Sequence, residues 1–370
     1  MGFLDFIFYT FIVVVFFQAV FYIFFFGRFA FLKEKGNSSK NIAISVIVCA
    51  KNEAENLKTF LPSIIDQDYP NFEIVLINDA SNDNTLKVMK RFEKQHQNIK
   101  IVDVKSIEAF WGNKKYALTL GIKASTHDYL LFTDADCKPL SKNWIKEMTS
   151  YFDNEKTVVL GYGGYSKIKK SFLNKLIRFE TLITAVYYFS FAKIGMPYMG
   201  VGRNLAYTKK EFFNANGFIN HIKVRSGDDD LFINQVANNK NTSICFSKES
   251  FTESIPKQTF KEWFKQKRRH VSTAIHYKKQ HKILLALIYS LQLLFWLLSI
   301  ILLVSTYKWL IVCSLFLFRI ILQYIILGAS SKKLEEKDLL ALLPFLEIFL
   351  IITQLTIFIN NLISKPNYWK

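Results

Sequence analysis

The segment Tyr129-Leu130-Leu131-Phe132-Thr133-Asp134-Ala135-Asp136-Cys137 joins an apolar run of strand type to two carboxylates. Open α/β sheets bind ligands in the crevice at the carboxyl ends of their strands. At such a strand end, Asp134 and Asp136 are candidate ligands of one hard divalent cation, which binds through one or two carboxylates plus phosphates. The alternative is a plain polar turn, so the surrounding sequence has to decide between the two.

The sequence around this segment alternates between strand and helix patterns. Continuous β-branched or apolar runs, typical of strands buried on both faces, occupy residues 43–49, 72–78, 99–104 and 129–133. Helical patterns at 54–66, 85–95 and 114–124 separate them, and a helix at 142–152 and a strand at 157–165 follow. This alternation predicts βαβ units, so we expect an α/β, Rossmann-like fold with a mostly parallel sheet. Glycine-rich dinucleotide and Walker fingerprints are absent from the sequence.

Composition indicates a membrane protein. The 370 residues are 51% hydrophobic and include 36 Phe, which is too apolar for a wholly soluble enzyme. The formal net charge of +18 is not gathered into dense Lys/Arg runs, so we expect no nucleic-acid partner. Positive charge on the cytosolic side of a membrane fits better. The four cysteines lie far apart without metal-ligand spacing, which predicts free thiols in a reducing compartment.

Four apolar segments, at residues 6–26, 283–304, 309–328 and 339–363, are candidates for membrane helices. Asp5 precedes the first, whereas Arg28 and Lys33 follow it, so the positive-inside rule places the next domain in the cytoplasm. A cleaved signal peptide would need a basic start, a shorter apolar core and a small-residue cleavage site, and none is present. We expect a transmembrane helix within 1–32, a cytosolic domain at 41–282 and a membrane region of two to three helices at 283–363.

Three features of the apolar regions leave alternatives open. Residues 173–192 fit either a helix lying on the bilayer surface or a buried core helix. Arg319 and Glu347 lie inside apolar segments and form an intramembrane pair, unless Arg319 snorkels to the interface. Three full C-terminal crossings would leave Lys365 and Lys370 on the side that the positive-inside rule disfavours, so the last segment is either a crossing or partly interfacial.

A series of short polar motifs follows the strands along residues 43–280. The motifs are Cys49-Ala50-Lys51-Asn52-Glu53, Asn78-Asp79-Ala80-Ser81, Lys114 with Ala117-Leu118, Asp134-Ala135-Asp136, Gly227-Asp228-Asp229-Asp230-Leu231 and Gln266-Lys267-Arg268-Arg269-His270. Each is weak alone, but their order and spacing together are specific. In this order the chain resembles the membrane-bound family-2 inverting glycosyltransferases of the GT-A fold.

The resemblance implies a nucleoside-diphosphate-sugar donor. Asp79 would contact its base and ribose, and Glu53 would lie near the nucleoside, where a carboxylate can accept hydrogen bonds from ribose hydroxyls. A residue that only starts a helix is the compatible alternative for Glu53. Lys114 would meet the diphosphate, although a solvated surface lysine is the alternative and the neighbouring Lys115 leaves the register open.

The resemblance also implies a divalent cation, Mg or Mn, with Asp136 as its first ligand. Asp134 would contact the sugar phosphate or the cation's hydration shell. The cation would neutralise charge on the departing diphosphate. Gln266 and Arg269 match the family's Gln-x-x-Arg-Trp site, and the planar guanidinium suits a diphosphate. His270 replaces the family's Trp, and the alternative for this basic stretch is a cluster attracted to anionic lipid.

The chemistry needs a general base that takes the proton of the acceptor hydroxyl. Three adjacent carboxylates repel one another and raise at least one pKa, which suits a base. The resemblance places the base at Asp229, with Asp228 as the alternative. The structural alternative is that Asp228 caps the helix that follows while Asp229 and Asp230 favour its dipole. The loop 200–204 would line the sugar and acceptor pocket, unless it is a simple turn.

The sequence therefore predicts a multi-pass cell-membrane enzyme with a cytosolic catalytic domain. It would transfer a sugar, with inversion, to a lipid or lipid-linked acceptor. The alternatives are a processive polysaccharide synthase and a non-catalytic membrane scaffold. Because His270 offers a smaller face than Trp and the C-terminal spans are few, we expect one or a few sugars to be added. Trp263 or Tyr277 would weaken that expectation if either lined the same wall.

Overall fold

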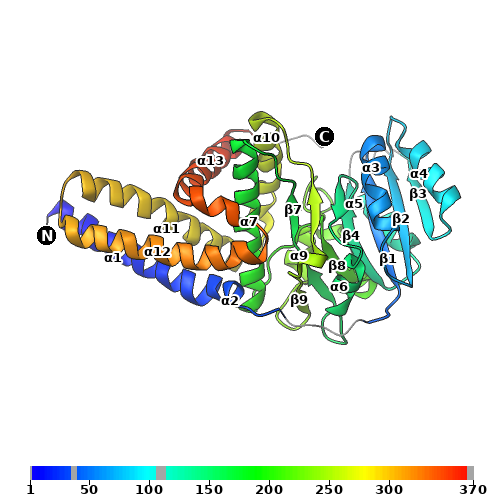
Figure 1. Ribbon diagram of the computed structural model, residues 1–370, viewed down its shortest axis with the longest axis horizontal. Helices are drawn as coiled ribbons and strands as arrows, with labels where there is room; N and C mark the ends of the chain where they lie inside the picture. The colour runs from blue at the N-terminus through cyan, green and yellow to red at the C-terminus, as the bar shows by residue number, and fades with distance from the viewer. Residues whose placement is uncertain (1, 35–39, 106–113, 365–370) are drawn as a thin grey trace.

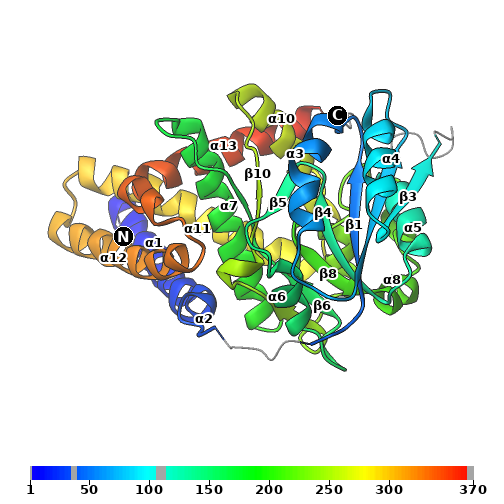
Figure 2. The same ribbon diagram turned by 45° about the vertical axis from the view of Figure 1, so that its right-hand side comes forward.

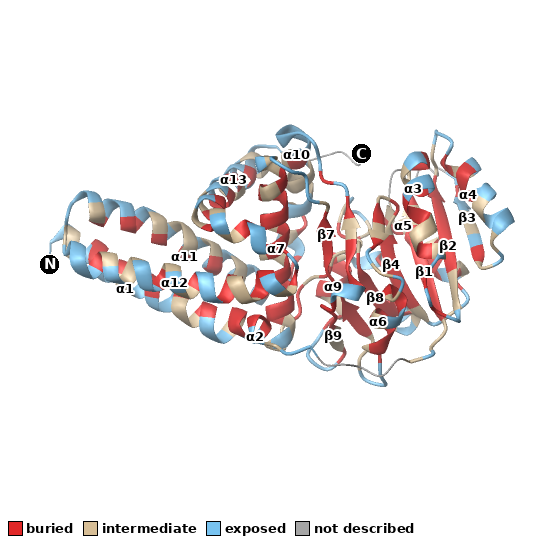
Figure 3. Cartoon of the chain, viewed as in Figure 1, coloured by how far each residue is buried: buried red, intermediate tan, exposed pale blue. Residues whose placement is uncertain are grey.

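The structure, a computed structural model, describes residues 2–34, 40–105 and 114–364 (Figure 1). Figure 1 shows an α/β domain at one end of the molecule and long helices extending from the other. Helix α7 (Phe172–Lys193) lies between these two parts. Strand side chains are largely buried, whereas the outer faces of the long helices are exposed (Figure 3).

Seven strands form the main sheet, in the order β3-β2-β1-β4-β8-β6-β9. Strands β3, β2, β1 and β4 are parallel, whereas β8 is antiparallel to both β4 and β6. The strand β1 lies between β2 and β4, which creates the switch point where such sheets bind ligands. The bounds are β1 (Ile44–Ala50), β2 (Phe72–Asp79), β3 (Ile99–Val104), β4 (Tyr129–Asp134), β6 (Val158–Leu160), β8 (Leu205–Thr208) and β9 (Thr242–Ile244).

Helices cover both faces of this sheet, as the continuous apolar strands require. Along β1, Val46 and Val48 pack with one set of helices and Ile47 packs with the other. The first set is α3 (Ala54–Ile65), α4 (Thr85–Gln95) and α6 (Trp144–Ser150). The second is α5 (Lys114–Ala124), α8 (Lys209–Asn214), α9 (Asp230–Val236) and α7. The predicted α/β fold is confirmed, and 85–95, 99–104 and 114–124 have the predicted bounds.

The prediction of one strand over 157–165 was wrong. The chain breaks at Gly161 and passes from β6 to β7 (Gly163–Tyr165), which belongs to a second, three-stranded sheet with β10 (Thr252–Ser254) and β5 (Cys137–Pro139). The reason is Asn204, whose amide packs beside Gly161 and donates to the carbonyl of Tyr162 at 2.8 Å. A Cβ at Gly161 would lie 2.5 Å from the Asn204 Cγ, so only glycine permits this crossing.

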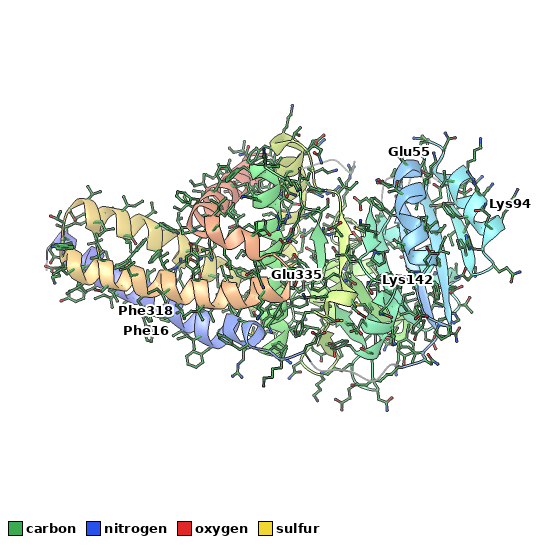
Figure 4. All side chains as sticks on the ribbon, viewed as in Figure 1. Phe16, Glu55, Lys94, Lys142, Phe318 and Glu335 are labelled. Carbon is green, nitrogen blue, oxygen red and sulfur yellow. The ribbon has the colours of Figure 1, made fainter. Side chains whose placement is uncertain are left out.

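Four helical stretches are long and apolar enough to cross a membrane: Phe3–Ala30, Lys279–Val304, Trp309–Lys333 and Lys337–Ile363. The first runs from α1 (Phe3–Val20) through the π-helix η1 (Phe21–Phe26) into α2 (Gly27–Ala30). It packs against α11 (Lys279–Val304) and α12 (Trp309–Lys333). Figure 4 shows Phe16 and Phe318 on the outer surface of these helices, where a bilayer would cover them.

The last segment begins and ends beside the α/β domain. Before α13 (Leu343–Ile363), the 3₁₀-helix η6 (Lys337–Leu342) carries Asp338, which accepts two hydrogen bonds from Arg178 of α7. Near the other end, the Asn361 Oδ1 accepts from Arg268 at 2.9 Å, on α10 (Phe260–Val271). Figures 1 and 2 show α13 running at an angle to α1, α11 and α12. Of the two alternatives, this geometry favours a segment that does not cross completely.

Helix α7 is a buried core helix. Its residues from Leu176 to Phe179 and from Tyr188 to Phe191 are buried between the domain and the long helices. Ser171 caps its start by accepting from the Asn174 backbone N–H. Of the two alternatives for 173–192, the structure supports burial in the protein.

Arg319 and Glu347 form the predicted pair, rather than a snorkelling arginine. The Arg319 guanidinium donates to Glu347 at 2.5 Å and 3.0 Å, and both side chains are buried. It also donates to Gln18 at 2.7 Å and to Gln323 at 2.5 Å, so α1, α12 and α13 share one polar network. A buried charge is tolerated when it is paired and hydrogen-bonded.

Removing one partner of this pair should destabilise the protein. Glu347→Leu leaves the Arg319 charge buried without its carboxylate, and such a change costs about 3 to 5 kcal/mol. Thermal unfolding in detergent measures the loss. The double variant Arg319→Met/Glu347→Leu should recover most of the stability, and equal melting of Glu347→Leu and the parent would contradict the prediction.

Candidate active site

One continuous cavity of about 1150 Å³ opens at the carboxyl ends of β1, β2 and β4. Every residue that the sequence assigned to catalysis, donor binding or metal binding lines it. They are Glu53, Asp79, Lys114, Asp134, Asp136, Asp228, Asp229, Gln266 and Arg269. The structure thus brings together groups that lie more than 200 positions apart in the sequence, while their individual roles remain predictions.

Two interlocked turns follow β1 and β2. Asn52 and Ala80 have φ of 56° and 46°, in the left-handed region that non-glycine residues rarely occupy. The Asn52 N–H donates to the Ser81 hydroxyl at 3.0 Å, and the Asn52 Oδ1 accepts from the Asn82 N–H at 2.9 Å. These turns direct Asp79 toward the cavity, with Lys51 3.8 Å from its carboxylate. Burial raises the pKa of Asp79, and Lys51 partly offsets this.

Glu53 starts a helix and also faces the cavity, so its predicted place near the nucleoside stays a prediction. It is the N-cap residue of α3, and its buried side chain lines the cavity. Its Oε2 accepts from the Asn56 side chain at 2.5 Å, which fixes its direction.

Lys114 lies between two of the carboxylates. Its Nζ is 2.9 Å from Asp134 and 2.9 Å from Asp228. Burial lowers the pKa of Lys114, but the two carboxylates outweigh this and hold it well above the ordinary value. In turn, burial raises the pKa of Asp228, yet Lys114 brings it below the ordinary value. Asp228 is therefore an ionised partner of a lysine at neutral pH.

Asp229 differs from its two neighbours. Its Oδ2 accepts from the Gly202 N–H at 2.7 Å, and a Cβ on Gly202 would lie 3.3 Å from that oxygen. Burial and the charges of Asp228 and Asp230 raise the pKa of Asp229 to about 7. Asp230 already accepts from Thr273 and, at 2.6 Å, from Tyr277. The carboxylate best suited to exchange a proton near neutral pH is therefore Asp229, which also caps α9 in place of Asp228.

The residues at the end of β4 fit a hard divalent cation. Oxygen atoms of Asp134 and Asp136 and the Cys137 sulfur all lie within 4.8 Å of one another. Burial raises the pKa of the Cys137 thiol well above its ordinary value, and that thiol lies 3.1 Å from the Ser254 hydroxyl. Mg²⁺ prefers oxygen ligands, so the two carboxylates would bind the cation and Cys137 would not. All four cysteines are free thiols, as predicted.

Helix α10 forms the opposite wall. Gln266, Arg269 and His270 line the cavity, whereas Arg268 points to α13. Trp263 is buried against Phe260 and does not line the cavity. It therefore does not replace the missing tryptophan. Tyr277 does line the cavity.

Lys115 has a role that the sequence reasoning missed. Its buried ammonium donates to the carbonyls of His221, Val224 and Ser226 at 2.8, 2.9 and 2.8 Å. Burial lowers its pKa to about 8, although the nearby carboxylates oppose this. Lys114 therefore faces the acids, and Lys115 orders the loop that leads to them. No local signal separates the two lysines, because these carbonyls lie more than 100 residues further along the chain.

Arg203 and Lys51 also line the cavity. The Arg203 guanidinium stacks 4.3 Å from the centre of the Tyr165 ring and donates to the Ser254 hydroxyl at 3.1 Å. The loop 200–204 thus contributes Gly202 and Arg203 to the site, as expected of a pocket-lining loop. The signal for Lys51 was present in the first motif, where it precedes Asn52-Glu53.

The fold and this strand-end site define the GT-A class. The mannosyltransferase PcManGT from Pyrobaculum calidifontis, solved in complex with GDP-Man and Mn²⁺, superposes with a TM-score of 0.59 at 17% identity. The superposition covers 90% of this chain and 98% of that one. At this identity the likeness shows the fold alone.

Residues 45–218 match the family profile described as glycosyl transferase family 2, so the chain carries a domain of that family. The poly-β-1,6-N-acetyl-D-glucosamine synthase of Staphylococcus epidermidis is 39% identical over 93 residues, which are 25% of this chain and 21% of that protein. Glycosyltransferase AglE of Haloferax volcanii is 30% identical over 109 residues, 29% of this chain and 34% of that protein. The chain thus matches about a fifth to a third of the length of these relatives.

Replacing Lys115 should loosen the loop that carries the acids. Lys115→Met leaves the three carbonyls without this donor, at about 1 to 3 kcal/mol for each that stays unsatisfied. Thermal unfolding should show the loss, and hydrogen exchange should rise across residues 221–229. The matched control is Lys123→Met, an exposed lysine of the same helix, which should behave like the parent. Equal exchange in both variants would refute the role of Lys115.

Proposed function

We propose that the protein transfers a sugar, with inversion, from a nucleoside-diphosphate sugar to a hydroxyl group of a lipid or lipid-linked acceptor. The observation that carries this proposal is the difference between the contacts that the acids make. Lys114 bridges Asp134 and Asp228 at 2.9 Å each, while Asp229 accepts from Gly202 in the same cavity. The donor and the acceptor hydroxyl then meet between the ends of the parallel strands and α9.

Asp229 acts as the general base. It takes the acceptor proton as the hydroxyl oxygen forms its bond to the anomeric carbon and the bond to the diphosphate breaks. A base is most effective when its pKa lies near the working pH, and that of Asp229 is about 7. The Gly202 N–H orients the carboxylate, and the small Gly202 leaves room for an acceptor.

The donor side of the site is assigned to the start of α3, the end of β2 and α10. Asp79 and Glu53 bind the nucleoside, and Arg269 and Gln266 bind the diphosphate from the opposite wall. Asp134 and Asp136 would hold a divalent cation, which when bound neutralises charge on the leaving diphosphate. Lys114 would add its positive charge on the same side of the diphosphate, because its ammonium already lies against Asp134.

The long apolar helices support a membrane location for the site. Arg28 at the end of the first stretch and Lys332 and Lys333 at the end of α12 lie on the same side as the α/β domain. Asp5 and Tyr307 meet at the far end of the bundle. By the positive-inside rule, the domain is cytosolic and the protein is a multi-pass cell-membrane enzyme.

A processive polysaccharide synthase is the second candidate, because the matched relatives include a poly-β-1,6-N-acetyl-D-glucosamine synthase. His270 and the small number of long helices favour transfer of one or a few sugars, whereas Tyr277, which lines the cavity, favours the synthase. Sizing the products of purified protein separates the two. A non-catalytic scaffold, the third alternative, would gain no thermal stability from UDP or GDP with Mn²⁺, whereas a binding site would by mass action.

The test of this function is Asp229→Asn. The variant should lose at least about a hundredfold in turnover, because general bases contribute roughly 10² to 10⁴. Nucleotide-sugar binding should stay close to that of the parent, because the base acts in the transition state. Radiolabelled nucleotide sugars and total lipid extract provide the assay, and calorimetry measures donor binding. The matched comparison is Asp228→Asn. Loss of turnover there with full activity in Asp229→Asn would reverse the assignment.

The pH profile gives an independent check on Asp229. The base must be ionised to act, so kcat/KM should be level above about pH 7 and fall tenfold per pH unit below it. The groups that set this value are Asp228, Asp230 and Lys114. A profile with no inflection between pH 5 and pH 8, roughly the range of histidine-like titration, would contradict the assignment.

Asp136→Asn should remove cation-dependent transfer. Burial and the Asp134 charge raise the pKa of Asp136, which indicates a site that favours an added positive charge. We expect the parent to lose activity in chelator and regain it with Mn²⁺ or Mg²⁺. The variant should unfold at the parent's temperature but gain no stability from Mn²⁺ with nucleotide. Full activity of the parent in excess chelator would refute the assignment of a metal site.

A further inference from the structure

The cavity does not end at the candidate active site. It continues between the long helices into what we term the interhelical compartment. That compartment is lined by Tyr22 of η1, Tyr187 of α7, Gln292 of α11, Gln323 of α12, and Glu347 and Gln354 of α13. One continuous space therefore connects the three acids of the domain with the polar network around Arg319.

Polar side chains line part of this compartment, on helices that are otherwise apolar, beside apolar residues such as Phe26, Leu327 and Leu350. The outward faces of α11 and α13 carry exposed residues such as Leu297, Ile300 and Ile352. The inward faces carry Gln292, which donates to the Tyr187 hydroxyl at 2.9 Å, and Gln354. Amides and hydroxyls at membrane depth are costly unless they meet polar groups. Their concentration on the inward face indicates a space that holds water or a polar ligand.

The charges in the compartment are already balanced. Glu347 lines it, but Arg319 neutralises this carboxylate through hydrogen bonds of 2.5 and 3.0 Å. Within the described part of the chain, the stretches of η1, α11, α12 and α13 that line the cavity contribute no lysine, arginine or histidine to it, whereas α10 contributes Lys265, Lys267, Arg269 and His270. A phosphate would lack a cation there, whereas amides, hydroxyls and tyrosines both donate to and accept from hydroxyl groups.

The compartment also reaches the outer surface of the helices. Ala286 and Ser290 of α11 and Phe358 of α13 line the cavity and are exposed. Two small side chains one helical turn apart leave room between α11 and α13. Above this opening, the Tyr289 hydroxyl donates to the Ile351 carbonyl at 3.1 Å and joins the two helices. The opening faces the region where a bilayer would lie.

From these contacts we infer that the interhelical compartment binds the head group of the acceptor lipid, that this head group is uncharged and rich in hydroxyls, and that its chain leaves through the opening at Ala286 and Ser290. The inference rests on the proposed function and specifies its acceptor. An acceptor held in this way presents a hydroxyl toward Asp229 along the polar wall and keeps its chain in the membrane. We expect a lipid with a phosphate as its head group not to bind in this compartment.

The test measures access to the compartment without turnover. Gln354→Cys is placed in phosphatidylcholine nanodiscs and treated with a small cationic methanethiosulfonate reagent, with peptide mass spectrometry reading each cysteine separately. We expect Gln354→Cys to react and Ile352→Cys, on the exposed apolar face of the same helix, not to react. Hexadecyl β-glucoside at ten times its dissociation constant should slow the reaction of Gln354→Cys roughly tenfold by mass action. Hexadecyl phosphate at the same mole fraction should not.

The opening is tested by filling it. In the Gln354→Cys protein, Ala286→Trp should abolish protection by the glucoside, whereas Leu297→Trp, an exposed position of the same helix, should preserve it. If Gln354→Cys does not fold, Gln292→Cys takes its place. No reaction at either cysteine, no protection, or equal protection by the phosphate would overturn the inference. Because labelling needs no sugar transfer, a protected compartment in a protein without transferase activity would refute the proposed function alone.

Discussion

The structure depends on the compensation of repelling carboxylates at the ends of the strands. Asp79, Asp134, Asp136 and the three acids before α9 converge on one cavity, and such a cluster would repel itself without compensation. Lys114 reduces this repulsion because its ammonium lies between Asp134 and Asp228. The compensation is uneven: Lys114 brings the pKa of Asp228 below its ordinary value, whereas burial and the neighbouring charges raise the pKa of Asp229 to about 7.

Much of the fold could be predicted because its signals are local. Buried parallel strands are continuous apolar runs, and α4, β3 and α5 begin and end where their patterns do. Strands of three residues, such as β6, β7, β9 and β10, carry almost no pattern. Their pairing depends on contacts such as that of Asn204 with Gly161, which are distant in sequence. A run over 157–165 therefore looks like one strand, although it serves two sheets.

In the site, too, some features follow from local sequence and others depend on contacts that are distant in sequence. Motif order predicted which residues line the cavity, because strand ends meet at one edge of a parallel sheet. It placed the base at Asp229 with Asp228 as the alternative, but the contact that sets Asp229 apart comes from a glycine 27 positions away. It chose Lys114 and left the register against Lys115 open. The path of α13 was likewise undetermined. Hydropathy measures whether a helix could cross a membrane, whereas Arg268 and Asn361 determine where this one ends.

The backbone at Asn52 and Ala80 carries a consequence for how the molecule evolves. A non-glycine residue in the left-handed region costs about 1 to 3 kcal/mol and persists only where its surroundings demand it. Selection for thermal stability alone would favour glycine at position 80, where no Cβ penalty arises. Instead the chain keeps an alanine, whose narrower conformational range restricts the turn that follows Asp79. Stabilising substitutions are therefore better sought far from these two turns.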